Sequence, residues 1–238
     1  MPKPTTEDEL SPLRRSMFAV MFEAHPQPSR RDTYLELATL LGTNLLQIPG
    51  FVDDDYYQCL SRVGWVLSLS IWRDEKALVR WRTHPKHQVA QAKGRDEVFI
   101  DYTLRIGQLT HDTDLPDGCM LSEQRLDETV AGAGNTAVLV DTSQATPVPT
   151  AHDPVEMASH LGLDLNADGL TSWDIYEAAM RPGHFLMRTV WHDQAAAEAF
   201  ETTATFPDGT RLRRIRIIRF YSMYDRREAP QYYPDHPT

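Results

Sequence analysis

The chain has 238 residues, 41% of them hydrophobic, and its 34 acidic and 24 basic residues give a formal net charge of −10. This balance argues against nonspecific binding to nucleic acid, which needs a concentrated basic surface. The apolar runs are far shorter than the roughly 18 residues of a membrane span, and the first 16 residues are polar, unlike a signal peptide. Only two cysteines are present, Cys59 and Cys119, without metal-ligand spacing. We therefore expect a cytoplasmic protein that binds neither membranes nor nucleic acid and has no disulfide framework.

The first half of the chain predicts four strands and two helices. Between residues 30 and 46 the apolar side chains recur at nearly helical spacing, and Asp74 is well placed to cap a second helix. In the third strand, alternation places Ser68, Ser70 and Trp72 on the face opposite Trp65. The expected elements are a strand at 17–24, a helix at 30–46, strands at 51–60 and 65–72, a helix through Ala77, Leu78 and Trp81, and a strand at 99–106.

The second half predicts the same element order with shorter helices. Asp193 takes the place of Asp74 as a helix cap, and a turn at 207–209 leads into the last strand. The expected elements are a strand at 136–141, a helix at 153–163, strands at 173–179 and 183–191, a helix at 193–200 and a strand at 213–221. The last strand carries five arginines between positions 211 and 219, which we interpret as the solvated face of an edge strand.

An internal repeat relates the two halves. The triplet Trp72-Arg73-Asp74 recurs as Trp191-His192-Asp193, an offset of 119 residues. The same offset aligns four further landmarks: Trp81 with Phe200, Gly50 with Gly169, Tyr57 with Tyr176, and the apolar run 18–22 with 137–141. A period this long is close to a small domain, so it indicates two fused domains rather than a solenoid.

The order β-α-β-β-α-β in each half is that of the ferredoxin-like split unit. Two such units pack most simply through their exposed sheet faces. The predicted fold class is therefore α+β, with two fused ferredoxin-like domains forming a dimeric α/β barrel within one chain. The expected segments are a flexible arm at 1–16, a first domain at 17–109, a linker at 110–135, a degenerate second domain at 136–221 and a C-terminal tail at 222–238.

An ordered set of motifs in the first half resembles the antibiotic biosynthesis monooxygenase family. These motifs are Trp72-Arg73-Asp74-Glu75-Lys76-Ala77-Leu78, Trp81-Arg82, His84-Pro85-Lys86-His87, Ala90-Gln91-Ala92-Lys93-Gly94-Arg95 and Asp101-Tyr102. The resemblance covers about residues 17–109, and it is weaker over 136–228, where the His-Pro-x-His and Gly-Arg segments are missing. It implies an oxygenase that acts on a small aromatic, polyketide-like substrate and O2, either forming a quinone from a phenol or anthrone or cleaving a ring, as in secondary metabolism.

The family resemblance leaves the cofactor open. Its members include cofactor-free oxygenases, fused enzymes that cleave angucycline rings, and haem-degrading enzymes, and fold analogy cannot choose among them. The axial His of the haem-degrading group falls here on Gln91 and Thr210, which argues against that chemistry, although His87 one turn earlier is an alternative haem ligand. No glycine-rich phosphate loop and no third ligand beside His84 and His87 are visible. We expect no resident cofactor or metal, with reduced flavin as a diffusible co-substrate and haem as alternatives.

The catalytic candidates are His87, His84 and Arg95. A cofactor-free route needs a base that converts the substrate to an electron-rich anion, and His has a suitable ordinary pKa of about 6.5. Both histidines lie in the segment that the second half lacks. Arg95 is a candidate partner for an oxyanion. The alternative interpretation is that the histidines are solvated and that Arg95 pairs with a carboxylate such as Asp96 or Asp101.

Aromatic and strand residues complete the predicted site. Flat rings stack favourably on a planar substrate, and core packing is the alternative role of each ring. His184 and Arg188 share a strand face, where an inward Arg188 would be a buried charge that requires a partner or an anionic ligand. The substrate-binding candidates are Trp72, Trp81, Trp65, Tyr57, His184 and Arg188. A noncatalytic binding or assembly protein remains the alternative from another class, and the chain is expected to be a monomer or a homodimer.

Overall fold

The structure is a computed structural model that describes residues 13–145 and 153–229. Most of the expected N-terminal arm, residues 1–12, and the end of the C-terminal tail, residues 230–238, lie outside the described residues. At the start of the described part, β1 (Leu13–Arg15) pairs in parallel with β6 (Cys119–Leu121). The segment 110–135 thus contains β6 as well as the end of β5, which runs to Asp112.

Each half contributes four strands to the barrel. The first half contains β2 (Phe18–Pro26), α1 (Arg31–Leu45), β3 (Phe51–Cys59), β4 (Val66–Trp72), α2 (Glu75–Arg82), α3 (Pro85–Lys93) and β5 (Phe99–Asp112). The second half contains β7 (Thr136–Asp141), α4 (Pro154–His160), β8 (Leu170–Ala178), β9 (Phe185–Trp191), α5 (Gln194–Thr203) and β10 (Arg211–Ser222). A 3-10 turn (Pro28–Arg30) precedes α1, and a π-helical segment (Gly94–Val98) follows α3.

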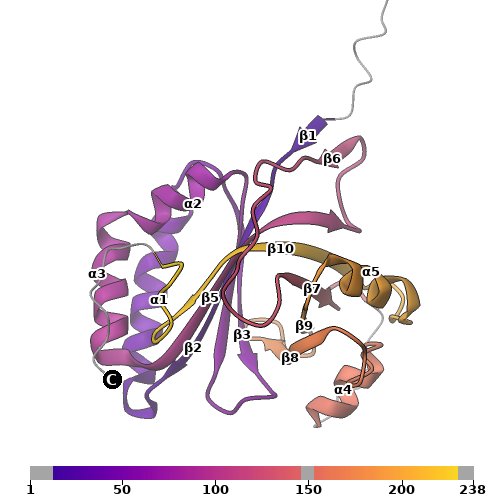
Figure 1. The fold of residues 1–238 in the computed structure, drawn as a ribbon. Helices are drawn as coiled ribbons and strands as arrows, with labels where there is room; N and C mark the ends of the chain where they lie inside the picture. The colour runs from indigo at the N-terminus through magenta and orange to yellow at the C-terminus, as the bar shows by residue number, and fades with distance from the viewer. Residues whose placement is uncertain (1–12, 146–152, 230–238) are drawn as a thin grey trace, which may run out of the picture.

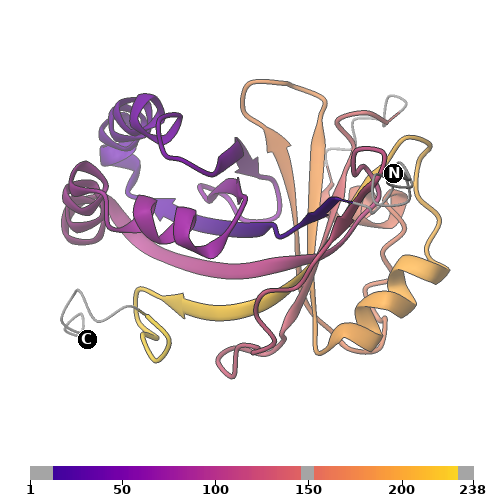
Figure 2. The same cartoon turned by 90° about the horizontal axis from the view of Figure 1, so that it is seen from above.

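The eight strands close into one antiparallel barrel in the order β10-β5-β2-β4-β3-β8-β9-β7. Figure 1 shows α1, α2 and α3 on the outside of the first half and α4 and α5 on the outside of the second. Figure 2 shows the long β5 and β10 running together across both halves. This architecture confirms the predicted α+β fold of two fused ferredoxin-like units forming an intrachain barrel.

The internal repeat is visible in the element boundaries. The strands β3 and β8 begin at residues 51 and 170, and β4 and β9 begin at 66 and 185, an offset of 119 in both cases. Gly50 and Gly169 occupy equivalent turns with φ of 93° and 79°. A Cβ on either glycine would lie 2.6 Å from the Cβ of an alanine in the following helix, so the helices α2 and α5 approach the turns closely.

Helix capping explains where α2 and α5 begin. The Asp74 carboxylate accepts a hydrogen bond from the Ala77 N–H at 2.8 Å, and Asp193 accepts one from Ala196 at 2.9 Å, as the sequence predicted. The helix α3, with Pro85 in its first turn, is an additional helix that the two-helix pattern of the sequence omitted. Among the described residues α3 has no counterpart in the second half, so within 13–145 and 153–229 the first half has three α-helices over its sheet and the second has two.

Buried apolar side chains form one cluster inside the barrel and further clusters between the barrel strands and the helices. The interior is filled by alternate strand residues of both halves, including Met21, Leu69, Leu139 and Leu186. The outer faces pack against the helices, around Trp72 in the first half and Trp191 in the second. Both tryptophans are fully buried, with 0% and 1% exposure.

The arginine-rich last strand is not an edge strand, which corrects the sequence interpretation. The strand β10 pairs with both β5 and β7 and closes the barrel. Its arginines make ion pairs, among them Arg211 with Asp112 and Arg213 with Asp141, at 2.7 and 2.8 Å. Arg214 pairs with Glu198 and Glu201 of α5, and Arg216 pairs with Glu123. The arginines therefore pair with neighbouring strands, with a helix and with the segment between the halves.

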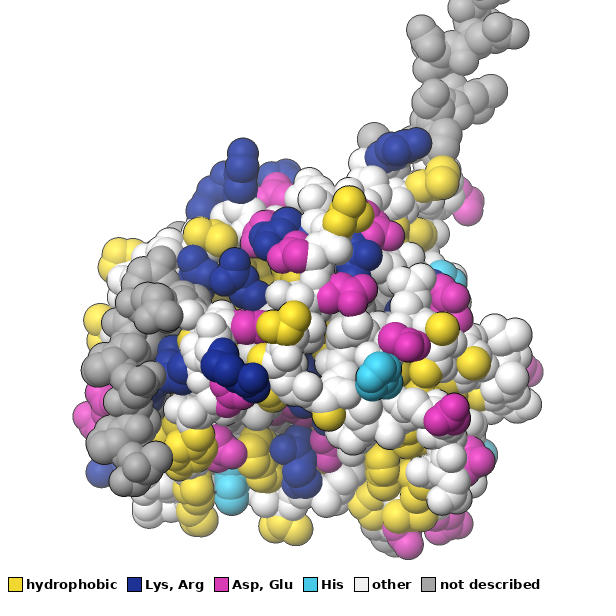
Figure 3. Space-filling model, in the orientation of Figure 1, with side chains coloured by type: hydrophobic (Ala, Val, Ile, Leu, Met, Phe, Trp, Pro, Cys, Tyr) yellow, Lys and Arg dark blue, Asp and Glu magenta, His cyan; other side chains and the backbone are white. Residues whose placement is uncertain are grey.

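The outer surface mixes charges of both signs, as Figure 3 shows for one face. No helix within residues 13–145 and 153–229 is long and apolar enough to cross a membrane.

Candidate active site

A cavity lies between the outer face of the first-half sheet and the helices α1, α2 and α3. These three helices lie on the left of Figure 1. We call it the helix–sheet cavity, and its volume is about 220 Å³. Residues of the same strand face it alternately, so Val20 and Phe22 of β2 and Ser68 and Ser70 of β4 line its floor. The remaining lining residues are Tyr34, Leu37, Ala38, Leu41, Leu45, Tyr56, Leu78, Trp81, Arg82, His87, Ala90, Gln91, Phe99, Tyr102, Leu104, Ile106, Tyr221 and Arg226.

His87 is the imidazole that lines this cavity. Its ring stacks on Trp81 with centroids 4.2 Å apart and an interplanar angle of 22°. Its Nδ1 lies 2.9 Å from the Trp81 carbonyl oxygen. Because a carbonyl only accepts, Nδ1 carries the proton and Nε2 is left with its lone pair. The Gln91 side chain, 3.4 Å from Nε2, is also a cavity residue.

Burial makes His87 a neutral side chain near neutral pH. Desolvation lowers the pKa of its imidazole to about 4, against the smaller raising effect of the Trp81 carbonyl. The unprotonated ring is therefore ready to accept a proton, although it is a weaker base than a solvated histidine.

Besides His87 and Gln91, the polar side chains of the cavity carry hydroxyls and guanidiniums. Burial raises the pKa values of Tyr34 and Tyr56, and it raises that of Tyr221 to about 12, so these phenols stay protonated and act as neutral donors. Arg226 donates to the Tyr102 hydroxyl at 3.0 Å and lines the cavity together with Arg82. Among the described residues, no carboxylate lines the cavity. It is an apolar pocket with two positive charges.

Only His87 and Trp81 of the predicted site residues line this cavity. His84 is the N-cap residue of α3, its ring lies 5.9 Å from the Trp81 ring, and it is not among the described residues that line the cavity. Arg95 is buried in the π-helical segment, with 5% exposure, and it too lies outside the set of described lining residues.

The other predicted aromatic residues pack elsewhere. Trp72 is fully buried against the helices and donates from Nε1 to Ser70 Oγ at 2.9 Å. Trp65 stacks on His25 and lies under the Arg62 guanidinium, 4.2 Å from it. Tyr57 belongs to the barrel interior, on the opposite face of β3 from its neighbour Tyr56, which lines the cavity. Trp72 and Tyr57 therefore lie in the structural core, and the partly buried Trp65 packs against it.

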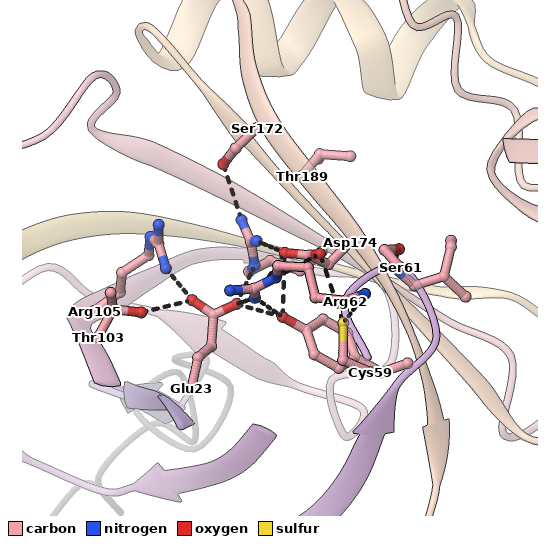
Figure 4. A network of polar contacts seen from close by, with 12 residues as sticks. Glu23, Cys59, Ser61, Arg62, Thr103, Arg105, Ser172, Asp174 and Thr189 are labelled. Atoms are coloured by element: carbon pink, nitrogen blue, oxygen red, sulfur yellow. Dashed lines mark hydrogen bonds and ion pairs between the residues drawn. The ribbon is translucent and has the colours of Figure 1, made fainter. Parts of the chain in front are cut away.

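Arg188 faces the barrel interior, and its charge is paired there. Its side chain has 2% exposure, and its Nε lies 3.1 Å from Glu23 of β2, while Nη2 bonds to Asp174 of β8. Figure 4 shows the ion pairs of this network, in which carboxylates and guanidiniums from both halves of the barrel meet. The sequence prediction that an inward Arg188 needs a partner agrees with these contacts, but Arg188 does not share a cavity with His87. His184 precedes β9, in the turn before Phe185.

Two further arginines complete this interior network. Arg62 lies 2.8 Å from Glu23 and 2.9 Å from Asp174, and Arg105 bonds to the other oxygen of Glu23. Burial alone would raise the pKa of Glu23, but the three guanidiniums hold it well below its usual range. Glu23 is therefore ionised in the interior of the barrel.

The sequence did not indicate most of the cavity residues. The apolar periodicity of residues 30–46 predicts a helix face that includes Tyr34, Leu37, Ala38 and Leu41. No sequence signal indicates that this face and the sheet leave a cavity between them. Arg226 and Tyr221 come from the other half of the chain, more than 100 residues from His87. The strand alternation that places Ser68 and Ser70 on one face was the one usable signal.

No cluster of three or more His, Cys, Asp or Glu side chains that could hold a metal ion occurs in the described parts of the chain.

Comparisons with known proteins identify the family. The model of the antibiotic biosynthesis monooxygenase family matches residues 17–93. A jasmonate monooxygenase of Pyricularia oryzae is 41% identical over 225 residues, which cover 92% of this chain and 99% of the relative. The chain belongs to the antibiotic biosynthesis monooxygenase family. It is therefore a monooxygenase, and residues 17–93 of this monooxygenase contain His87 and Trp81.

A solved structure supports the fold of this monooxygenase. An aldoxime dehydratase in complex with butyraldoxime aligns with a TM-score of 0.51 at 12% identity, over 87% of this chain and 81% of that one. At this identity the likeness concerns the fold alone.

Proposed function

We propose that this monooxygenase holds a small, largely apolar organic acid in the helix–sheet cavity and transfers one atom of O2 to it, with jasmonate as the leading substrate. The observation that carries the proposal is the lining of the cavity: apolar walls, two guanidiniums and, among the described residues, no carboxylate. The name of the 41% identical relative supports the same substrate, because jasmonate is a carboxylate with an apolar body.

Electrostatics favour an anionic substrate. Arg82 and Arg226 line a cavity whose other walls are hydrocarbon and aromatic, so their charges act in a medium of low dielectric. A carboxylate there gains charge-assisted hydrogen bonds, each about twice as strong as a neutral one. The phenols of Tyr34, Tyr56 and Tyr221 stay protonated and add donors.

The reaction must balance electrons. Hydroxylation inserts one oxygen atom into a C–H bond and reduces the other to water, which consumes two electrons and two protons from a donor. Reduced flavin is our proposed diffusible donor for this route. Conversion of an acidic CH2 group to a carbonyl needs no external donor, because the CH2 group supplies the electrons and one water leaves.

An aromatic substrate is the second candidate, and the state of His87 favours it. The imidazole, with a pKa of about 4, removes a proton from a phenol-like acid of pKa about 10 at a cost of about 8 kcal/mol. This cost lies within the barrier of about 16 kcal/mol for a turnover of about 10 per second. A simple ketone is a far weaker acid, so deprotonation by His87 suits a phenol or anthrone better than jasmonate.

The test is product analysis under ¹⁸O2. The purified full chain is incubated separately with jasmonate and with an anthrone, each with and without reduced flavin, and the products are measured by mass spectrometry. One ¹⁸O atom in a jasmonate product supports the leading substrate. Incorporation only into the anthrone, without flavin, favours the aromatic candidate with His87 as base. No incorporation into either substrate contradicts both, and a Soret band on adding hemin would then direct attention to His87 as a haem ligand.

A further inference from the structure

A second hollow opens inside the barrel, on the opposite face of the sheet from the helix–sheet cavity. We call it the arginine cleft. Phe22 and Leu104 line the helix–sheet cavity, whereas their neighbours Glu23 and Arg105 line the cleft. Its volume is about 660 Å³. The residues that line it are Glu23, Ser61, Arg62, Thr103, Arg105, Pro154, Val155, Ser172, Trp173, Asp174 and Arg188.

The charges of the arginine cleft do not cancel. Three guanidiniums, those of Arg62, Arg105 and Arg188, face two carboxylates, Glu23 and Asp174. Both carboxylates are already shared: each contacts Arg62 and Arg188, and Glu23 contacts Arg105 as well. One positive charge is therefore left over in a site where desolvation makes an uncompensated charge costly.

The excess charge is localised on Arg105. Its side chain has 13% exposure, and among the described residues it makes one hydrogen bond, from Nη1 to Glu23, while its guanidinium lies 5.0 Å from the Phe220 ring centroid. A guanidinium has five N–H donors. Burial, together with the charges of Arg188 and Arg62, lowers the pKa of Arg105 despite the contact with Glu23. The remaining donors are accessible from the cleft.

Three hydroxyls and an apolar wall complete the arginine cleft, and one of the hydroxyls, that of Thr103, already donates to Glu23. Ser172 Oγ accepts a hydrogen bond from Arg188, and Ser61 Oγ accepts one from the Ile175 N–H, so both hydroxyl hydrogens are left to donate. Trp173, Pro154 and Val155 form apolar surface beside these donors.

We propose that the arginine cleft is a second binding site, separate from the helix–sheet cavity, for a small organic monocarboxylate. One negative charge cancels the single excess positive charge, which favours a monocarboxylate over a phosphate dianion. The planar fork of Arg105 matches a carboxylate, and the apolar wall accommodates an organic body. This inference does not depend on the substrate of the monooxygenase.

Benzoate is a suitable probe, with benzamide as its uncharged counterpart at equal ionic strength. Calorimetric titration of the full chain should give saturable benzoate binding and no comparable benzamide binding. Arg105→Gln leaves two guanidiniums with two carboxylates, so it should fold, and it should weaken benzoate binding at least about tenfold, which equals about 1.4 kcal/mol.

Arg30→Gln, on the exposed surface outside both sites, is the matched control and should leave benzoate affinity within about twofold. Arg226→Gln removes a guanidinium from the helix–sheet cavity, so it identifies any benzoate that binds there and should leave the binding event that Arg105→Gln weakens within about twofold. If Arg105→Gln fails to fold, Val155→Trp obstructs the cleft without changing its charge and should weaken benzoate at least about tenfold. No benzoate binding by the unaltered protein, or binding that Arg226→Gln abolishes and Arg105→Gln or Val155→Trp preserves, would overturn the proposal.

Discussion

The ring of His87 lies 4.2 Å from the ring of Trp81, and its Nδ1 donates to the carbonyl oxygen of the same residue. The end of α2 therefore fixes both the orientation and the tautomer of the imidazole. At the position of Trp81 the second half has Phe200, which stacks on Trp191 instead, and α5 ends with no helix like α3 after it. The arrangement that prepares a base exists in one half of the barrel.

Replacement of this base should affect turnover far more than folding. With a phenol or anthrone as substrate, we expect His87→Gln to lower kcat by about 10² to 10⁴-fold, the usual contribution of a positioned general base, and to change KM little. Steady-state kinetics with the substrate identified by ¹⁸O incorporation provide the measurement. His160→Gln, on the exposed end of α4, is the control and should keep full activity. Activity of His87→Gln within about threefold of the unaltered protein would rule out the base.

The lowered pKa of His87 also predicts a pH dependence of stability. In the unfolded chain the imidazole has a pKa of about 6.5, and in the folded protein its pKa is about 4. Between these values the unfolded state binds the extra proton, so the free energy of unfolding decreases as pH falls from about 6.5 to about 4, by up to about 3 kcal/mol. Denaturant unfolding at pH 7 and pH 4.5 measures this loss. His87→Phe should remove this part of the pH dependence, and an unchanged slope in His87→Phe would show that other groups cause it.

Glu23 should be the most sensitive position of the barrel interior. Glu23→Gln leaves three guanidiniums with Asp174 as the remaining carboxylate, and breaking a buried pair in this way costs about 3–5 kcal/mol. Because the folded-state pKa of Glu23 is lowered, its contribution is present above the unfolded pKa of about 4.3 and is lost as pH falls below it. Chemical denaturation at pH 7 is the measurement. Glu36→Gln, on the exposed face of α1, should change stability by less than about 0.5 kcal/mol.

The paired tryptophans predict a structural rather than a substrate-binding role. Trp72 and Trp191 donate from Nε1 to Ser70 and Thr189 at 2.9 and 2.8 Å, each two residues upstream. Trp72→Phe and Trp191→Phe should each destabilise the protein by about 1–3 kcal/mol, since each leaves a buried hydroxyl without its donor and opens space in the core. The activity of the folded protein should be unchanged at a temperature below both unfolding transitions. A selective rise in KM for Trp72→Phe would instead assign Trp72 to the substrate.

The sequence predicted the fold because its signals are local or repeated. The caps Asp74 and Asp193, the glycines Gly50 and Gly169 and the 119-residue offset each report a short-range constraint or a duplication, and the structure confirms the strands that they delimit. The sequence did not predict α3 as a separate helix because Pro85 interrupts the apolar periodicity after α2.

The site was harder to predict because it depends on distant residues and on the phase of strand alternation. Tyr56 and Tyr57 are neighbours, yet one lines the helix–sheet cavity and the other fills the barrel, and composition cannot distinguish them. Glu23 meets Arg188 across 165 residues of sequence. These two charges come together only when the barrel closes, so the spacing of residues in the sequence does not predict the pair.

The most direct test of the account is obstruction of the helix–sheet cavity without touching a polar group. Ala38 of α1 lines this cavity, and Ala195 lies on the exposed face of α5, so Ala38→Trp and Ala195→Trp make the same chemical change inside and outside it. The rate of ¹⁸O incorporation should fall at least about 100-fold in Ala38→Trp and remain within about twofold in Ala195→Trp. Equal activity of the two folded variants would contradict the claim that this cavity holds the substrate of the monooxygenase.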